Sequence, residues 1–461
     1  MSRLEGCVWL DSSLQTDDGL SRYSYMAALP FSTLRIDKPY GEALDTVAKR
    51  LAAFQQSKLP GIPPMQGGWL GWFGYELGRC FESIPAAAIN DFSLPLAMLG
   101  LYDVVLSWDH STGQGYVVSQ GWPQVESLAR QEHAYRRMCH ILSILDQEEA
   151  AVSGPSATQR LRRNYTVSPH RLAPQYPTRW SSDWTSNFTS QGYRQAVDRC
   201  VQYVHAGHIF QVNLSQRLLR RSICEPEELA LHLHRVNPAT FAGYADFGRV
   251  QVVSSSPERF LRVHDQVIEA RPIKGTRPRM SDPMADVGMS QLLLQSQKDR
   301  SENVMIVDLQ RNELSQLAQL DSVQVKALAA LERYPYVWHL VSVLQARLEN
   351  SRSIQDIMHA AFRGGSITGA PKIRAMEIIA ELEPTVRGPY CGSLGYVSFA
   401  GDIDLNILIR TITVCDGWWQ VPVGGGIVAD SQPALEEQET WHKAQGILRA
   451  IDTLPFGRRV P

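Results

Sequence analysis

Apolar side chains recur every three or four residues in several stretches of the chain, which is the spacing of an amphipathic helix. One such stretch covers residues 193–204 and is followed by Gly207, a residue type that often ends a helix. The same spacing predicts helices over residues 289–315, 371–382 and 433–451. The proline at the start of the 371–382 stretch suits the first turn of a helix.

Shorter stretches with alternating or continuous apolar residues predict β-strands. These strands come in groups rather than one per helix, so the pattern favours an α+β fold with a large, mostly antiparallel sheet over a doubly wound parallel sheet. The expected strands cover residues 209–217, 241–247, 250–255, 259–263, 267–273, 393–399, 404–413 and 417–423.

One change of composition divides the chain. In residues 147–184 the helical pattern stops and Pro, Ser, Arg and Gln accumulate, which is typical of a linker or a long crossing loop. This segment separates an N-terminal part, residues 1–146, from residues 185–455, which hold most of the candidate chemistry.

The charge of the chain is nearly balanced. Among 461 residues, 45 are Lys or Arg and 47 are Asp or Glu, with no block of one sign. A balanced surface argues against nucleic acid or an anionic membrane as the main partner. No apolar run reaches the roughly 18 residues of a membrane-spanning helix, and the N-terminus lacks a signal-peptide layout, so we expect a cytoplasmic protein.

The seven cysteines are scattered and never form a Cys-x-x-Cys pair. This favours reduced thiols over a disulfide or zinc framework. The cysteines and histidines also form no recognisable Cys-His or Ser-His-Asp arrangement.

Two glycine-rich segments could contact an anion. Residues 364–369 lack the Lys and Ser/Thr of a phosphate-binding loop, and Gly424, Gly425 and Gly426 lack the third spaced glycine of a dinucleotide fingerprint. Each segment is either a simple turn or a place where backbone N–H groups approach a carboxylate or phosphate. Both interpretations stay open at this level.

Charged residues in unusual places provide further candidates. Arg410 lies in an apolar, strand-like run, so it either forms a structural ion pair or faces an anionic ligand. Glu436 and Glu439 share one helical face, and Asp299 and Glu302 have the same spacing on another predicted helix. Such pairs can bind a hard cation such as Mg²⁺, although charged helix faces are commonly just solvated.

Lys274 and Glu258 each lie at the end of an expected strand. Lys274 is either an exposed turn residue or, in a pocket that lowers its pKa, a nucleophile. Glu258 is either a partner for an arginine such as Arg259 or an acid in the same pocket.

Six short segments of the sequence carry a shared pattern. They are residues 207–215, 256–260, 271–276, 302–309, 364–372 and 424–431. Taken in order, these segments resemble the chorismate-utilising enzymes. The resemblance extends from about residue 191 to residue 451 and implies one large α+β domain. In such a domain two mostly antiparallel β-sheets pack together with helices outside, as in anthranilate synthase component I, and the active site lies in a cleft between the sheets.

Two positions within these segments separate the reactions of the family. Members similar to the anthranilate-forming enzymes have Ala where this chain has Lys274, whereas members that aminate chorismate at C4 have Lys. Gln211 stands where isochorismate-forming members carry a lysine that activates water, and an amide cannot act as that base. The resemblance therefore implies conversion of chorismate and ammonia to 4-amino-4-deoxychorismate, for 4-aminobenzoate and folate synthesis. Anthranilate formation and a non-catalytic, tryptophan-binding regulatory role are the alternatives.

The resemblance also implies a role for each candidate residue. Lys274 attacks C2 of the ring, Glu258 protonates the departing C4 hydroxyl, and His339 contacts that hydroxyl. Mg²⁺, held by Glu302 and Glu439 with Glu436 and Asp299 nearby, binds the ring carboxylate. The remaining substrate contacts are implied for Gly275, Thr276, Tyr390, Arg410, Gly424, Gly425 and Gly426.

The resemblance further implies two partners. The sequence has no Gly-x-Cys-x-Gly segment with a downstream His-x-Glu, so we expect a separate glutamine amidotransferase subunit, component II, to supply ammonia as the other half of a heterodimer. Residues 237–241 depart from the pattern of relatives that are inhibited by tryptophan, which leaves tryptophan binding open. The residues that match the tryptophan pocket of relatives are Ser12, Arg22, Tyr23, Thr240 and Phe241.

Overall fold

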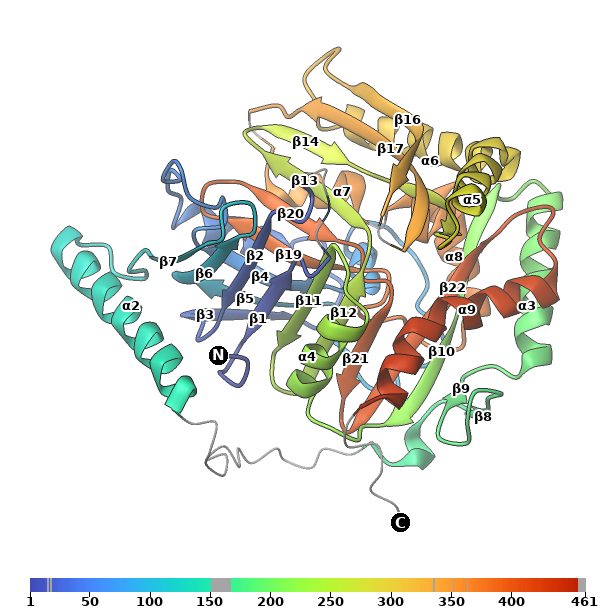
Figure 1. The fold of residues 1–461 in the computed structure, drawn as a ribbon, viewed down its shortest axis with the longest axis horizontal. Helices are drawn as coiled ribbons and strands as arrows, with labels where there is room; N and C mark the ends of the chain where they lie inside the picture. Colours follow the sequence, from blue (N-terminus) through green and yellow to red (C-terminus); the bar gives the residue numbers. More distant parts are fainter. Residues whose placement is uncertain are drawn as a thin grey trace.

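Two antiparallel β-sheets packed face to face form the body of the protein, and helices cover their outer faces (Figure 1). The structure is a computed structural model that describes residues 1–14, 16, 19–150, 167–334, 336–350, 352–362 and 364–454. This architecture confirms the predicted α+β fold with two mostly antiparallel sheets and helices outside.

The first sheet has twelve strands within the described residues. Its order is β7-β6-β2-β1-β11-β12-β21-β22-β10-β9-β8, and β18 also pairs with β10. The strands are β1 (Val8–Asp11), β2 (Tyr23–Ala27), β6 (Val104–Asp109), β7 (Gln114–Ser119), β8 (Tyr176–Pro177), β9 (Thr185–Ser186), β10 (Gln211–Arg221), β11 (Phe241–Asp246), β12 (Val250–Ser256), β18 (Gly369–Ala370), β21 (Thr411–Cys415) and β22 (Trp418–Ile427).

The second sheet has ten strands in the same part of the chain, in the order β15-β17-β14-β13-β20-β19-β4-β5-β3, with β16 paired to β17. The strands are β3 (Ser32–Ile36), β4 (Gly68–Phe73), β5 (Ala97–Tyr102), β13 (Arg259–His264), β14 (Val267–Ala270), β15 (Ile273–Pro278), β16 (Gln324–Arg333), β17 (Val337–Arg347), β19 (Ser393–Ser398) and β20 (Ile403–Asn406).

Helices pack against the sheets through their apolar stripes. For example, Ala444, Ile447 and Ile451 repeat at helical spacing on α9 and join the core beside the first sheet. The α-helices are α1 (Asp45–Ala52), α2 (Ser127–Ala150), α3 (Ser190–His205), α4 (Pro226–Val236), α5 (Pro283–Gln295), α6 (Gln297–Ser315), α7 (Ile354–Ala361), α8 (Lys372–Leu382) and α9 (Pro433–Asp452). The short 3₁₀ helices are η1 (Tyr75–Cys80), η2 (Pro169–Arg171) and η3 (Gly365–Ile367).

The alternation of side chains along the strands separates the core into layers. On β12, Val252 joins a buried cluster with Leu70 and Trp72 of the second sheet, whereas the next residue, Val253, joins the cluster under α4 and α9. Successive side chains of a strand point to opposite faces, so one strand contributes to both layers. The first sheet is therefore buried on both faces along its central strands.

The N-terminal residues do not form a body of their own, because β1 and β2 belong to the first sheet while β4 and β5 belong to the second. The predicted segment 147–184 connects this part to the rest of the fold. Residues 151–166 of that segment, and residue 455 at the predicted end of the C-terminal region, lie outside the described residues.

Several predicted elements were wrong. The strand expected over residues 267–273 is two strands, β14 and β15. The strand expected over residues 404–413 is two strands, β20 in the second sheet and β21 in the first, because the chain changes sheets between them. The helix expected over residues 289–315 is two helices that meet at Ser296, whose side chain caps α6 by accepting from the Asp299 N–H at 3.3 Å. Strand β16 and the strands of the N-terminal part, β1–β7, have no counterpart among the expected strands.

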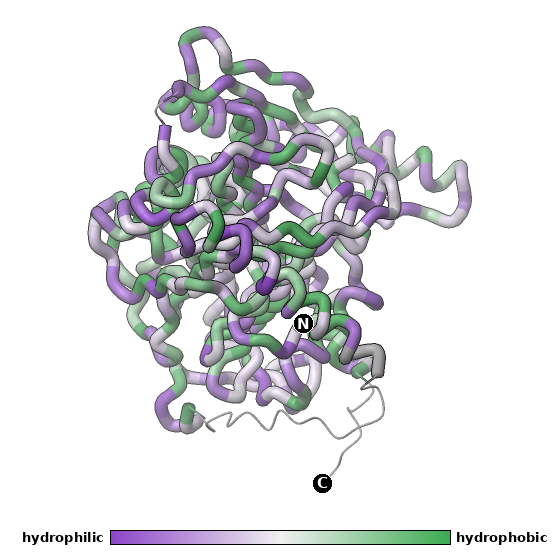
Figure 2. The backbone as a smooth tube through the Cα atoms, turned by 90° about the vertical axis from the view of Figure 1, so that its left-hand side faces the viewer, coloured by the Kyte–Doolittle hydropathy of each residue, from purple (hydrophilic) through white to green (hydrophobic). Residues whose placement is uncertain are grey.

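All seven cysteines are free thiols, and four of them are buried. Among the described helices, none is long and apolar enough to cross a membrane. In Figure 2, hydrophobic positions are interspersed with hydrophilic ones along the chain.

Candidate active site

Arg410 lies where the chain passes from the second sheet to the first, between β20 and β21. Its backbone has a φ of 50°, in the left-handed region that is uncommon for a side chain of this size. The sequence prediction that Arg410 is part of a strand was therefore wrong, because alternation of apolar residues cannot show where a chain leaves one sheet for another. Strain of this kind is often found at functional sites.

The Arg410 guanidinium makes no hydrogen bond or ion pair with the described residues. More than a third of the residue's surface is exposed, yet the protein around the guanidinium still lowers its pKa by desolvation, and Glu258 opposes this shift. Arg410 is thus a cation available to an anionic ligand.

Glu258 and Lys274 approach the same residue from neighbouring segments. Glu258 is 6% exposed and immediately precedes β13, whereas Lys274 lies in β15 and donates from Nζ to the carbonyl oxygen of Ser366 at 3.3 Å. Burial raises the pKa of Glu258 to about 7, against the opposing effects of Lys274, the Ile273 N–H and Ser366. Burial also lowers the pKa of Lys274, against the carboxylates of Glu302 and Glu258.

These shifts have a chemical consequence. A carboxyl group with a pKa near 7 keeps a proton available at neutral pH, and a desolvated amine loses its proton more readily than a free lysine. The pair combines an acid with an amine that can become a nucleophile.

His339 lies on β17 opposite Thr276 of β15, and its Nδ1 is 2.9 Å from the Thr276 hydroxyl oxygen. Burial lowers the pKa of His339 to about 4, and the nearby Arg410 charge acts in the same direction, while a hydrogen bond to Gly275 opposes them. The imidazole is therefore neutral at neutral pH. In this form one of its nitrogen atoms donates a hydrogen bond and the other accepts one.

Gly424, Gly425 and Gly426, which we call the glycine strand, lie inside β22 rather than in a turn. Of the two interpretations left open by the sequence, the simple turn is wrong, because these residues pair with β10, where Ser215, Leu214 and Asn213 lie opposite them. A Cβ atom at Gly424 would come within 2.5 Å of the Leu214 carbonyl oxygen. Glycine is thus required for close packing of the strands, not for a reversal of the chain.

Two predicted metal ligands cover the glycine strand. A Cβ atom at Gly425 would lie 3.5 Å from both Glu436 Oε2 and Glu439 Oε1 of α9. Lys443, one turn further along α9, pairs with Glu439 at 2.7 Å and donates to the Gly424 carbonyl oxygen at 3.1 Å. The sequence reasoning missed Lys443, although its i,i+4 spacing from Glu439 was a visible signal.

The other two predicted metal ligands lie on α6. Asp299 forms an ion pair with Arg277 at 3.1 Å. The Asp299 Cβ lies 2.9 Å from the position that a Cβ atom at Gly275 would take. Burial raises the pKa of Glu302. The Lys274 charge opposes this shift, and the Glu439 carboxylate reinforces it. No three of the four carboxylates, from α6 and α9, come within 4.8 Å of one another.

Tyr390 lies deeper than the other predicted substrate-binding residues. It is 4% exposed and is part of the buried core, with the Arg387 guanidinium 5.8 Å from its ring. Its role beside Arg410 stays a prediction.

The sequence profile of the chorismate binding enzymes matches residues 7–449. This chain belongs to that family. Aminodeoxychorismate synthase component 1 of Escherichia coli (strain K12) is 40% identical over 389 residues, covering 84% of this chain and 78% of the relative. Anthranilate synthase component 1 of Streptomyces coelicolor (strain ATCC BAA-471 / A3(2) / M145) is 36% identical over 445 residues, covering 96% and 83%. Among solved structures, anthranilate synthase component I from Streptococcus pneumoniae TIGR4 covers 92% of both chains with a TM-score of 0.78 and 27% identity.

A polar side chain in the core of this chorismate binding enzyme lies beside the glycine strand. Gln211 is fully buried, but neither atom of its amide has a hydrogen-bond partner among the described residues. Its Nε2 lies 2.5 Å from the position of a Cβ at Gly426. Buried amides are normally satisfied, so Gln211 is an exception among the described residues.

A separate cavity of about 660 Å³ lies away from Lys274, Glu258, His339 and Arg410. The structure brings together at this cavity all the residues predicted for the tryptophan pocket: Ser12, Arg22, Tyr23, Thr240 and Phe241. Arg22 is paired with Asp109 at 2.9 Å, so its charge is already balanced.

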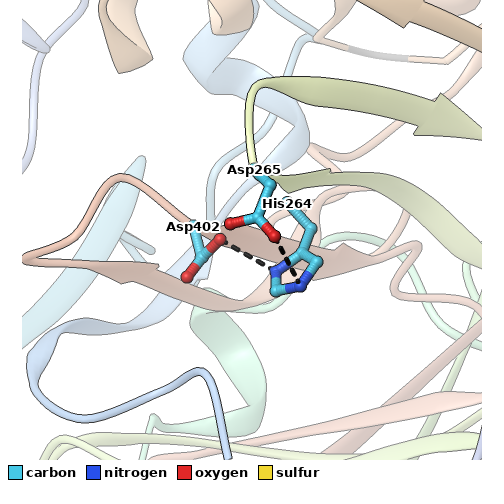
Figure 3. Close-up of side chains that lie close together, drawn as sticks. All are labelled: His264, Asp265 and Asp402. Atoms are coloured by element: carbon cyan, nitrogen blue, oxygen red, sulfur yellow. Dashed lines mark hydrogen bonds and ion pairs between the residues drawn. The ribbon is translucent and has the colours of Figure 1, made fainter. Parts of the chain in front are cut away.

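A cluster of three possible metal ligands lies at the edge of this cavity (Figure 3). The imidazole of His264 lies between Asp402, 2.9 Å from Nδ1, and Asp265, 3.5 Å from Nε2. The Lys58 ammonium contacts the same carboxylates, at 2.6 Å from Asp265 and 3.2 Å from Asp402. The Lys58 ammonium is therefore the cation of this cluster. It connects the cavity-lining segment 58–62 to the β13–β14 turn, which holds Asp265, and to the β19–β20 turn, which holds Asp402.

Proposed function

We propose that this chorismate binding enzyme aminates chorismate at C4 to form 4-amino-4-deoxychorismate, the activity of an aminodeoxychorismate synthase component I. The observation that carries the proposal is the pairing of Lys274 with Glu258 around Ser366, with Arg410 nearby as an available cation. The 40% identity to a relative named for this activity supports it.

In the proposed reaction, neutral Lys274 forms a bond to C2 of the chorismate ring as the bond from C4 to its hydroxyl breaks. Glu258 gives its proton to that hydroxyl, which leaves as water instead of hydroxide. Ammonia then forms a bond to C4, the bond between C2 and Lys274 breaks to release the neutral lysine amine, and the proton lost by the new amine returns to Glu258. The net change replaces one hydroxyl by one amino group.

The remaining residues of the site bind and orient the substrate. Arg410 and the backbone of the glycine strand would hold the enolpyruvyl carboxylate, and Tyr390 would line its pocket. Gly275 and Thr276 would line the ring, while neutral His339 would contact the departing hydroxyl. Such positioning contributes a large part of the acceleration of a two-substrate reaction.

Glu302, Glu436 and Glu439 would be the ligands of a magnesium ion, with Asp299 nearby on α6. Their oxygen atoms are the ligands that Mg²⁺ prefers. Burial raises the pKa of Glu302 and of Glu436, and in both cases the neighbouring Glu439 carboxylate reinforces the shift while Lys298 opposes it. A bound Mg²⁺ would supply positive charge for the ring carboxylate.

We further propose two partners of the chain. A relative named component 1 supports a heterodimer in which a glutamine amidotransferase subunit supplies ammonia, in a cytoplasmic route to 4-aminobenzoate and folate. The gathering of the five predicted pocket residues around one cavity supports L-tryptophan as a second ligand.

A single assay separates the proposed function from its alternatives. The chain is incubated with chorismate, MgCl₂ and NH₄Cl, and the products are analysed by mass and fluorescence. We expect a non-fluorescent product that carries an amino group in place of the hydroxyl and retains the enolpyruvyl group. Fluorescent anthranilate with released pyruvate would overturn the proposal in favour of the second candidate, which the 36% identity to an anthranilate synthase component supports. Unchanged chorismate, even with glutamine and the amidotransferase, would indicate a non-catalytic regulatory subunit.

A further inference from the structure

Arg387 and Glu383 form a buried ion pair behind the candidate active site. They are 5% and 4% exposed. The pair is bidentate, with Arg387 Nη2 2.6 Å from Glu383 Oε1 and Arg387 Nε 2.8 Å from Glu383 Oε2. Two parallel hydrogen bonds of this kind fix the orientation of both side chains.

One side of the pair holds the strand opposite the glycine strand. Arg387 Nη2 donates to the Asn213 carbonyl oxygen at 2.7 Å, and Glu383 Oε1 accepts from the N–H and hydroxyl of Ser215 at 2.8 and 2.9 Å. Asn213 and Ser215 lie directly opposite Gly426 and Gly424 in the pairing of β10 with β22. The ion pair therefore supports the strand on which the glycine strand rests.

The other side of the pair holds the segment that contacts Lys274. Arg387 Nη1 donates to the Ile367 carbonyl oxygen at 3.1 Å. The preceding residue, Ser366, accepts from Lys274 Nζ and lies beside the Glu258 carboxyl group. The Arg387 guanidinium thus connects the segment that contacts Lys274 with strand β10, which pairs with the glycine strand.

Further contacts hold Arg387 on both its side chain and its backbone. Its carbon atom lies 4.5 Å from the centre of the Tyr75 ring, and the Glu76 carboxylate accepts from the backbone N–H groups of Arg387 and Gly388 at 2.8 and 3.0 Å. A lysine at this position would keep the charge but has one nitrogen, which cannot donate to three segments with the geometry of a planar fork.

We propose that Arg387, oriented by Glu383, is a positioning residue that sets the spacing between Lys274 and the glycine strand. The proposal rests on the proposed function, because it assigns Arg387 to the reaction of Lys274. Arg387 acts through Ser366 and β10 and has no contact with substrate.

The test compares Arg387→Lys with Arg374→Lys. Arg374 is a matched control, since it also pairs with a glutamate, Glu377, but on the solvent side of α8.

In the amination assay we expect Arg387→Lys to lower kcat about 100-fold, the size of effect that a misplacement of about 1 Å can cause. Its KM for chorismate should change less than about threefold, because ground-state contacts remain. Arg374→Lys should match the wild type. Glu383→Gln, which keeps the shape of the side chain, should follow Arg387→Lys.

A second measurement does not depend on catalysis. The pH dependence of Lys274 labelling by trinitrobenzenesulfonate, read by peptide mass spectrometry, reports when that amine becomes neutral. We expect its midpoint to move toward that of a free lysine in Arg387→Lys and to stay unchanged in Arg374→Lys. A lower melting temperature with unchanged kcat and an unchanged labelling midpoint would overturn the positioning role. If the wild type does not aminate chorismate, the proposed function fails, and the labelling midpoint still decides whether Arg387 positions Lys274.

Discussion

Burial brings the pKa values of Glu258 and Lys274 closer together. It raises the pKa of the Glu258 carboxyl group to about 7 and lowers the pKa of the Lys274 amine. Burial of both groups therefore favours the neutral acid and the neutral amine over the charged pair. This relationship distinguishes the pair from an ordinary surface ion pair, in which both groups stay charged, and it leads to the first two predictions.

The first prediction concerns pH. Because Glu258 must be protonated to act as an acid, kcat/KM for amination should fall as pH rises above about 7. Glu258→Gln should lose this fall of kcat/KM with pH and should be slower by about 10²–10⁴-fold.

The folded state also binds more protons than the unfolded chain between the ordinary glutamate pKa and about 7. Stability should fall as pH rises through this window, by about 3 kcal/mol at most, and Glu258→Gln should lack that fall. Urea unfolding at both ends of the window checks this, and an identical pH dependence in both proteins would contradict it.

The second prediction concerns the nucleophile. Lys274→Ala should reduce C4 amination by about 10³-fold or more, because the covalent route is lost, and it could then reveal some anthranilate formation. Lys326→Ala is the matched control, since Lys326 is exposed on β16 and contacts only Gln324 in the described part of the chain. Product analysis by mass spectrometry measures both. Full activity of Lys274→Ala would remove the covalent role.

The third prediction concerns the glycine strand. Gly425→Ala should fold normally, because a Cβ atom there meets the Glu436 and Glu439 oxygens at an ordinary contact distance of 3.5 Å. The methyl group should nevertheless crowd the space between the strand and these carboxylates, and raise KM for chorismate and the Mg²⁺ concentration for half-activity about tenfold. Gly288→Ala on α5, with nothing within 4 Å of its Cβ position, should leave both constants unchanged. Unaltered Mg²⁺ dependence in Gly425→Ala would place the metal elsewhere.

The fourth prediction concerns the cavity of about 660 Å³. L-tryptophan at a hundred times its Kd should stabilise the folded chain by about 2.7 kcal/mol, visible as a rise in melting temperature. Ala242→Trp should abolish this rise by filling the cavity that Ala242 lines, whereas Ala52→Trp on the surface of α1 should retain it. Equal stabilisation of both variants would show that tryptophan binds outside the cavity.

The residues that carry the chemistry could be found in the sequence because they lie in short motifs. Lys274 and Glu258 were recognised together with their neighbours, and the i,i+3 carboxylates of α9 do lie together over the glycine strand. The same local reasoning failed for Arg410 and the glycine strand. Apolar alternation is identical on both sides of Arg410, and glycine favours turns unless a distant strand pairs with it. Lys443 and the Arg387–Glu383 pair show only an ordinary i,i+4 spacing in the sequence, whereas their contacts with the Gly424 and Asn213 carbonyl oxygens are long-range.

The sequence by itself determined the fold class, the family and the types of reactive group, because strand and helix periodicity and local motifs are properties of neighbouring residues. Only the tertiary structure decided what those groups can do. The change of sheet at Arg410 leaves its guanidinium without a carboxylate partner among the described residues, and burial beside Ser366 shifts the pKa values of Glu258 and Lys274. Desolvation and long-range pairing depend on residues brought together from across the chain, so no local pattern contains them.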